Sequence, residues 1–330
     1  MQLLLLLVGL AMIIKSADVL INSVSNIARR YGISSFIIGI TVIAFGTSAP
    51  ELAVGIISGL NRTNQLTLGN IIGSSLSNIA LIVGLAAVIF PLRVKDTVVQ
   101  REMPMLLMVE IILGAMLFGD GRLSRFEGVI LLGAFGLFLV YIWRDARNSV
   151  NIPINAESDI NAGDGPGLPQ ESNRDQKNSG LLKLSCYSVL SLLGLFIGGR
   201  ITVDSSTQIA LRLELSETLI GLTVVALATT MPELITSIMA VLKKEPDIVL
   251  GNCIGSNICN MLLVLGLSSV ISPIAAEKGL GIDVAAMILI TLLVWMMLMI
   301  KKELPRLSGI FLLTSYIAYL SFKVISVLVS

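Results

Sequence analysis

The sequence predicts an all-α membrane protein whose ten transmembrane helices form two five-helix halves of opposite orientation. Three observations support this fold class. Of the 330 residues, 55% are hydrophobic and only 14% are charged, against about 25% charged in an ordinary soluble domain. The apolar residues occur in stretches of about 20, the length that crosses a lipid bilayer. One pattern of small, polar and acidic residues occurs once in each half of the chain.

Polar turns divide the apolar residues into ten candidate spans. The first lacks the basic segment and the cleavage site of a signal peptide, so we expect it to remain as a membrane helix. The sixth is expected to continue as a long tilted helix toward Leu211. The ten spans cover residues 2–26, 33–60, 66–91, 104–119, 124–143, 181–199, 216–242, 247–272, 282–300 and 306–328.

Residues 145–180 differ in composition from the spans around them. They are rich in Asn, Asp, Ser, Gly and Pro and contain few large apolar side chains, a composition that favours a flexible linker. This linker separates a first five-helix repeat, residues 1–144, from a second, residues 181–330. Fifteen Lys and Arg residues fall in the linker and the loops on its side of the membrane, and seven fall on the other side. The positive-inside rule therefore predicts a cytoplasmic linker and two external termini.

Composition also excludes several functions. A net charge of +1 gives no bulk electrostatic attraction for nucleic acid. The chain has no His, which removes His metal ligands and His general bases. Its three Cys residues lie apart in apolar stretches and form no CxxC pair: Cys186, Cys253 and Cys259. Since no nucleophile is paired with a base, we predict neither an enzyme nor a bound cofactor.

An internal repeat relates the two halves. A shift of 182 residues superimposes residues 39–92 on residues 221–274 without a gap, and 23 of the 54 positions are then identical. Shared apolar composition does not explain the matched Pro, Glu, Gly, Asn and Ser residues among them. Because each half has five spans, an odd number, the second half enters the membrane from the opposite side. Inverted repeats of this kind build transporters, with the substrate site at the repeat interface near the midplane.

Each repeat places a glutamate within an apolar span, Glu51 in the first half and Glu233 in the second. A carboxylate in the middle of a bilayer is costly, so such a residue is a functional candidate. Pro50 and Pro232 directly precede the two glutamates. Since Pro has no N–H, each one deprives a backbone carbonyl of its helical donor and bends the helix beside the carboxylate.

Other oxygen-bearing side chains accompany the glutamates. Two hydroxyl residues lie four and three positions before each glutamate, and a Ser–Asn pair at i, i+4 occupies the following span of each half. Hard cations such as Ca²⁺ prefer ligands of this kind. The candidates are Thr47, Ser48, Glu51, Ser74 and Asn78 in the first half, and Thr229, Thr230, Glu233, Ser256 and Asn260 in the second.

At these residues the chain resembles the calcium/cation antiporter superfamily. GTSAPE at residues 46–51 and GNIIGSSLSN at residues 69–78 are similar to its first alpha-repeat. ATTMPE at residues 228–233 and GNCIGSNICN at residues 251–260 are similar to its second. The ten spans and the central linker agree with this family, and the short linker resembles its prokaryotic members.

The resemblance implies a Na⁺/Ca²⁺ antiporter with the sodium/calcium exchanger fold, working as a monomer in a prokaryotic cell membrane. It implies that Ca²⁺ and Na⁺ share Glu51 and Glu233, and that the hydroxyls and the carbonyls of Ala44 and Ala226 add ligands. It also implies that the long first helices of the two halves slide past a rigid core. Asn260 stands where the potassium-dependent branch carries Asp, which argues against K⁺ transport.

The two motifs are not identical. Thr230 stands where the first half has Ser48, so the two sides of the site need not bind Na⁺ equally.

Two other charge pairs lie in the first helices of the halves. Lys15 with Asp18, and Arg200 with Asp204, are spaced to neutralise one another locally.

Two other transport functions fit the same residues less well. A Ca²⁺/H⁺ exchanger would use the glutamates, but its branch places an Asn-containing motif before them, whereas this chain has hydroxyl residues there. A Ca²⁺ channel is disfavoured by the inverted repeats, which suit alternating access. In the expected mechanism one Ca²⁺ neutralises the two glutamates, Na⁺ competes for the same oxygens, and only a loaded site crosses.

Overall fold

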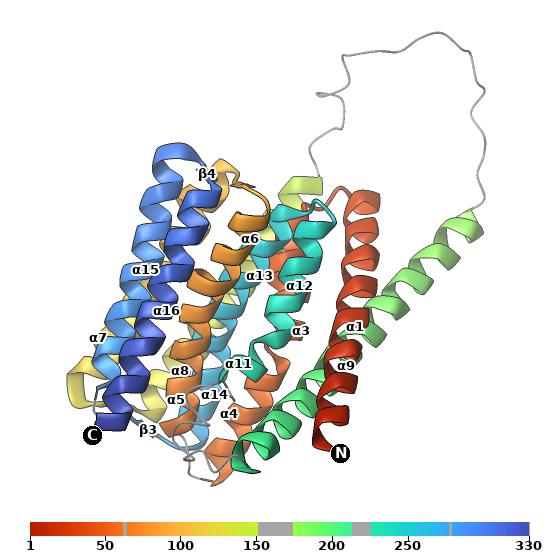
Figure 1. Cartoon of the computed structure of the whole chain (residues 1–330). Helices are drawn as coiled ribbons and strands as arrows, with labels where there is room; N and C mark the ends of the chain where they lie inside the picture. The colour runs from red at the N-terminus through yellow and green to blue at the C-terminus, as the bar shows by residue number, and fades with distance from the viewer. Residues whose placement is uncertain (62–64, 151–173, 213–225, 277–278, 330) are drawn as a thin grey trace.

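The computed structural model describes residues 1–61, 65–150, 174–212, 226–276 and 279–329. Two long helices, α1 (Gln2–Tyr31) and α9 (Arg174–Arg212), pack along one another at one side of the molecule (Figure 1). Small residues allow their close approach, since a Cβ on Gly198 would lie 3.0 Å from the carbonyl oxygen of Gly9. The prediction of a long sixth helix reaching Leu211 is confirmed.

The second span is broken in its middle. It consists of α2 (Ser35–Ile38), the π-helical segment η1 (Gly39–Ile43), α3 (Ala44–Thr47) and α4 (Ala49–Asn61). The two parts on either side of Ser48 are bent by 44°. Pro50 lies in the first turn of α4, where a residue without an N–H is tolerated. The 44° bend confirms the prediction that the helix bends beside Glu51.

The second half repeats this break. Helix α11 (Ala226–Thr229) ends directly before Thr230, and α12 (Met231–Leu242) begins directly after it. Ser48 and Thr230 adopt nearly the same backbone conformation, with φ −79°, ψ 0° and φ −83°, ψ 0°. Each glutamate therefore lies in the first turn of a helix that follows a break.

Two further spans form the centre of the molecule. They are α5 (Gln65–Leu76), η2 (Ser77–Ile82) and α6 (Val83–Ile89), and their counterparts α13 (Pro246–Cys259), η5 (Asn260–Val264) and α14 (Leu265–Ile271). In the second of these spans 94% of an apolar stretch of 18 residues is buried inside the protein. A Cβ on Gly251 or Gly255 would lie 2.5 or 2.6 Å from a carbonyl oxygen of α2 or η1. The two glycines thus allow close helix approach, whereas a Cβ on their counterparts Gly69 and Gly73 would meet nothing within 4 Å among the described residues.

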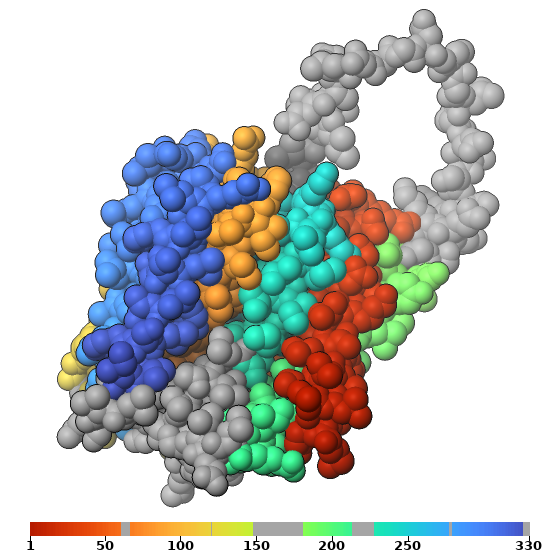
Figure 2. Space-filling view, in the orientation of Figure 1, coloured from red at the N-terminus to blue at the C-terminus, as the bar shows by residue number. Residues whose placement is uncertain are grey.

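Four other spans surround this centre. They are η3 (Val98–Glu102) with α7 (Met103–Asp120), α8 (Arg125–Val150), α15 (Leu280–Lys301) and α16 (Arg306–Val329). Helix α16 packs on α6, and α8 packs on α14. Figure 2 shows one face, with α16, α6, α12 and α1 in turn across it. In α16 only 17% of an apolar stretch of 18 residues is buried inside the protein. Its exposed apolar side chains are therefore suited to contact lipid.

Two short antiparallel ladders join the halves at opposite ends of the molecule (Figure 1). Strand β1 (Leu92–Arg93) pairs with β4 (Glu303–Leu304), and β2 (Arg122–Leu123) pairs with β3 (Ile274–Ala275). Each ladder takes one strand from each half. The halves are therefore interleaved in space and do not form two separate bundles.

Among the described residues, eight helices are long and apolar enough to span a membrane, and the bent pair on either side of Ser48 adds a ninth. The predicted seventh span is represented by α11 and α12, and its first ten residues, 216–225, lie outside the described residues. The count of ten stays a prediction. The linker predicted over residues 145–180 is helical at both ends, where residues 145–150 belong to α8 and residues 174–180 to α9. Its central part, residues 151–173, lies outside the described residues.

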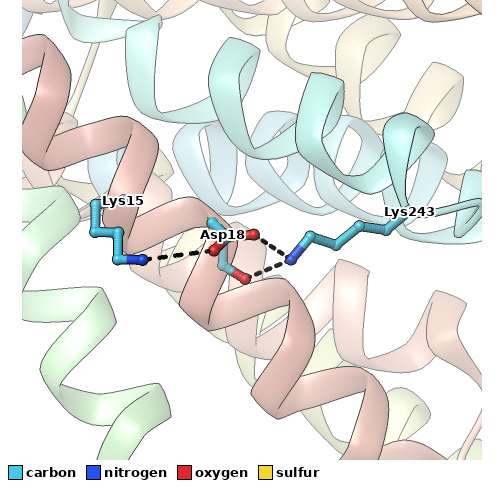
Figure 3. A network of polar contacts seen from close by, with 3 residues as sticks. All are labelled: Lys15, Asp18 and Lys243. Atoms are coloured by element: carbon cyan, nitrogen blue, oxygen red, sulfur yellow. Dashed lines mark hydrogen bonds and ion pairs between the residues drawn. The ribbon is translucent and has the colours of Figure 1, made fainter.

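An ion pair fastens α1 to the end of α12 (Figure 3). Lys243 Nζ lies 2.5 Å from Asp18 Oδ1 and donates to the Asp18 carbonyl oxygen at 2.7 Å. The predicted local pairs are present but longer, with Lys15 4.0 Å from Asp18 and Arg200 3.9 Å from Asp204. The sequence therefore indicated the neutralisation of Asp18 but missed its closer partner.

Candidate cation site

The two helix breaks bring the predicted glutamates together at the centre of the molecule. Glu51 and Glu233 are each 1% exposed. Their carboxyl groups are near enough for negative charges on them to repel one another. The Thr229 hydroxyl lies beside Glu51, and the Thr47 hydroxyl lies beside Glu233. Each carboxyl therefore faces a hydroxyl from the opposite half.

All the candidate side chains with a described environment are buried. None of the ten is more than 2% exposed: Thr47, Ser48, Glu51, Ser74, Asn78, Thr229, Thr230, Glu233, Ser256 and Asn260. The two backbone candidates, Ala44 and Ala226, begin α3 and α11 directly before the breaks.

Many of these buried oxygens have no hydrogen-bond donor among the described residues. Buried polar atoms in proteins are nearly always paired, so a group of unpaired ones requires an explanation. The unpaired oxygens are both carboxyl oxygens of Glu51 and Glu233, Ser48 Oγ, Asn78 Oδ1 and Asn260 Oδ1. A bound cation would satisfy them, since a cation takes the place of hydrogen-bond donors.

Two asparagines fix the threonine hydroxyls across the repeat interface. Thr47 Oγ1 lies 3.2 Å from Asn252 Oδ1, and Thr229 Oγ1 lies 3.4 Å from Asn70 Oδ1. These two contacts are related by the 182-residue shift. An asparagine oxygen can only accept, so the threonine is the donor in each of these two contacts, and Thr47 Oγ1 also lies 3.3 Å from the Ala44 carbonyl oxygen.

Other candidates make contacts within or between the halves. Ser256 Oγ lies 3.3 Å from Thr47 Oγ1 and 3.4 Å from the Ala44 carbonyl oxygen. That carbonyl also accepts from the Ser48 N–H at 3.0 Å. Ser74 differs, because its hydroxyl donates at 3.0 Å to the Ile71 carbonyl of its own helix. Ala44, Thr47 and Ser256 thus form one contact group beside the glutamates.

A third asparagine, Asn257, was not predicted. Its Oδ1 accepts from Asn78 Nδ2 at 2.9 Å, and its Nδ2 donates to the Ser75 carbonyl at 3.3 Å. The matched positions of Asn70 and Asn252 in the repeat could have indicated their roles. Asn257 has Ser75 as its counterpart, so the comparison of the halves gave no such signal.

The donor set determines the chemistry of the site. The described residues contain no group of three or more His, Cys, Asp or Glu side chains that could hold a metal. The site instead combines two carboxyls with neutral hydroxyl, amide and carbonyl oxygens. This set fits a hard cation bound through oxygen, with its charge balanced by two acids.

Comparisons with known proteins define the class. A family model described as "Sodium/calcium exchanger protein" matches residues 1–144 and 183–325. The chain is 35% identical over 297 residues to the inner membrane protein YrbG of Escherichia coli K12, covering 88% of each. It is 30% identical over 341 residues to the sodium/calcium exchanger MaX1 of Methanosarcina acetivorans, covering 96% of this chain and 97% of MaX1.

A solved structure shows the same fold. The sodium-calcium exchanger NCX_Mj, soaked with Na⁺ and Sr²⁺, superimposes with a TM-score of 0.81 at 28% identity, covering 97% of each chain. The fold is that of a membrane-embedded ion exchanger, a class of transporters and not of enzymes. The chain belongs to the sodium/calcium exchanger protein family.

Proposed function

We propose that the chain is a secondary active antiporter that exchanges Na⁺ for Ca²⁺ by alternating access. One observation carries the proposal: carboxyl groups from both halves meet in a buried site, and their oxygens make no hydrogen bond among the described residues. Two ionised glutamates carry a charge of −2, which one Ca²⁺ neutralises. Na⁺ uses the same oxygens, so the two ions exclude one another and their gradients become coupled.

The proposed architecture is ten helices in two inverted repeats, residues 1–144 and 181–330, with the linker between them. The ladders support it, because the 182-residue shift carries β1 onto β3 and β2 to within one residue of β4. The paired contacts Thr47–Asn252 and Thr229–Asn70 support it in the same way. An inverted repeat offers two related conformations, one open to each side.

The setting we propose is a prokaryotic cell membrane, with both termini outside and the linker in the cytoplasm. The charge distribution supports this orientation. We propose a monomer as the transporting unit, and this is supported by a site whose candidate ligands all come from one chain. Ca²⁺/H⁺ exchange remains the second candidate, because two buried carboxyls are also suited to carry protons.

The glutamates are tested by neutralising them one at a time. Glu51→Gln and Glu233→Gln, assayed as ⁴⁵Ca²⁺ uptake into Na⁺-loaded proteoliposomes, should each reduce uptake to background. Removing a unit negative charge about 4 Å from a divalent cation costs roughly 8 kcal/mol at an effective dielectric constant of about 20, twice the value for two unit charges, so the loss of Ca²⁺ affinity should exceed about a thousandfold.

Glu303→Gln is the matched control. It removes the same charge from a partly exposed residue that pairs with Arg93 at 3.2 Å, far from the site in the chain. Its uptake should equal that of the wild type. Uptake that persists in Glu51→Gln at the wild-type rate and Ca²⁺ dependence would sink the assignment.

A further inference from the structure

The two site asparagines are held differently. Asn78 and Asn260 occupy equivalent positions in the repeats, and both lie in π-helical segments, η2 and η5. Asn78 donates its Nδ2 to Asn257, whereas neither amide atom of Asn260 has a hydrogen-bond partner among the described residues. The candidate site therefore has one anchored amide and one that is not anchored.

The orientation of Asn257 follows from its two neighbours. Its Oδ1 faces Asn78 Nδ2, which only donates, and its Nδ2 faces the Ser75 carbonyl, which only accepts. Turning the amide over would place donor against donor and acceptor against acceptor. The 0% exposure of Asn257 leaves no solvent to relieve such contacts. Its orientation is thus fixed, and it fixes that of Asn78.

Anchoring leaves the Asn78 oxygen available. With Nδ2 committed to Asn257, Asn78 Oδ1 is directed away from it and has no donor among the described residues. Asn78 is only 1% exposed. An amide oxygen held in this way can enter a cation's coordination shell without first having to be ordered.

The counterpart in the other half cannot do the same. Position 257 corresponds to Ser75, whose hydroxyl donates at 2.8 Å to the Ile71 carbonyl of its own helix. Serine also lacks the second polar atom with which Asn257 bridges two groups. Because the first half has Ser75 where the second has Asn257, Asn260 has no equivalent anchor, whereas Asn78 is anchored by Asn257.

We propose that Asn257 is a positioning residue, which acts from the second half to hold the Asn78 oxygen on the cation and makes the two sides of the site unequal. The proposal rests on the proposed cation exchange, since it names a residue that supports the same site. Asn257 itself need not contact the ion, because its oxygen and its nitrogen are both engaged.

The test is a double-mutant cycle read by Ca²⁺ binding. Ca²⁺ affinity is measured by calorimetry on purified protein in Na⁺-free buffer for wild type, Asn257→Ser, Asn78→Ala and the double variant. Asn257→Ser installs the residue of the other repeat and should weaken Ca²⁺ binding about tenfold, the usual cost of losing an outer partner of a metal ligand. In the Asn78→Ala background the same substitution should cost nothing further.

Ser269→Ala is the control. It deletes a buried hydroxyl from α14, where the group donates only to the Gly266 carbonyl, and should leave Ca²⁺ affinity unchanged. A purely structural role for Asn257 predicts additive losses in the cycle, and additivity overturns the proposal. If Asn257→Ser does not fold, Asn78→Ala decides, because wild-type Ca²⁺ affinity in that variant also overturns it.

The same measurements separate this proposal from the function on which it rests. Failure of the wild type to bind Ca²⁺ and to take it up against a Na⁺ gradient contradicts the exchange itself. Normal wild-type binding and uptake, with Asn257→Ser indistinguishable from Ser269→Ala, contradicts only the role of Asn257.

Discussion

At the scale of single residues, the site is defined by polar atoms that lack partners. Ser48 illustrates this, since its hydroxyl is buried and unpaired among the described residues, whereas the Thr47 hydroxyl beside it is held by Asn252. A buried polar group without a partner destabilises the fold. The sequence keeps several such groups together, which is expected where a ligand completes them.

Ser48→Ala should separate stability from function. Because the buried hydroxyl makes no hydrogen bond within the described residues, its removal should not destabilise the fold and should raise the free energy of unfolding by about 1 kcal/mol. If Ser48 ligates Na⁺, the Na⁺ concentration for half-maximal exchange should rise severalfold. Thermal melts in detergent and Na⁺ titrations of ⁴⁵Ca²⁺ flux measure the two effects, and an unchanged Na⁺ dependence would remove Ser48 from the site.

The candidate oxygen ligands could be selected from the sequence because an acid in an apolar span is costly and is seldom kept without a function. The i, i+3 and i, i+4 spacings predicted that each glutamate shares a helix face with the hydroxyls of its own half. The helices instead break at Ser48 and Thr230, and the Thr47 and Thr229 hydroxyls lie beside the glutamate of the opposite half. The roles of Asn252 and Asn257 were not predictable in this way. Both depend on which helices of the two halves lie side by side, and spacing within one helix contains no such information.

At the scale of elements, the helix breaks position the site. Each break separates a four-residue helix, which carries the candidate carbonyl and threonine, from the longer helix that carries the glutamate. The π-helical segments η2 and η5 add a second irregularity beside each asparagine, and such segments are frequent at functional sites. The sequence predicted the breaks from Pro, but it contained no comparable signal for the π-helical turns.

Pro50→Ala tests whether the bend matters. Alanine restores an N–H that can bond the Gly46 carbonyl, so the 44° bend should decrease. The protein should remain folded, with a melting temperature at or above that of the wild type, while Ca²⁺ uptake falls by at least tenfold. Full uptake in a well-folded variant would show that the bend does not position Glu51.

At the scale of the whole molecule, the halves exchange parts across the repeat interface. Each ladder takes one strand from each half, and α13 packs on α2, η1 and α3 of the other half. Shared spacing of the motifs predicted a site between the halves. The Asp18–Lys243 ion pair between α1 and α12 was not predicted, since its partners are separated by more than 200 residues and spacing within one helix gives no information about such a contact.

The coupling ion distinguishes Na⁺/Ca²⁺ exchange from its rivals. The wild-type protein is reconstituted into vesicles loaded with Na⁺ and diluted into Na⁺-free medium containing ⁴⁵Ca²⁺, at equal pH on both sides. Parallel vesicles replace the Na⁺ gradient with a K⁺ gradient or with a pH gradient. Ca²⁺ should accumulate only with the Na⁺ gradient and should leave again when that gradient is reversed. Accumulation that follows the pH gradient and ignores Na⁺ would contradict Na⁺/Ca²⁺ exchange.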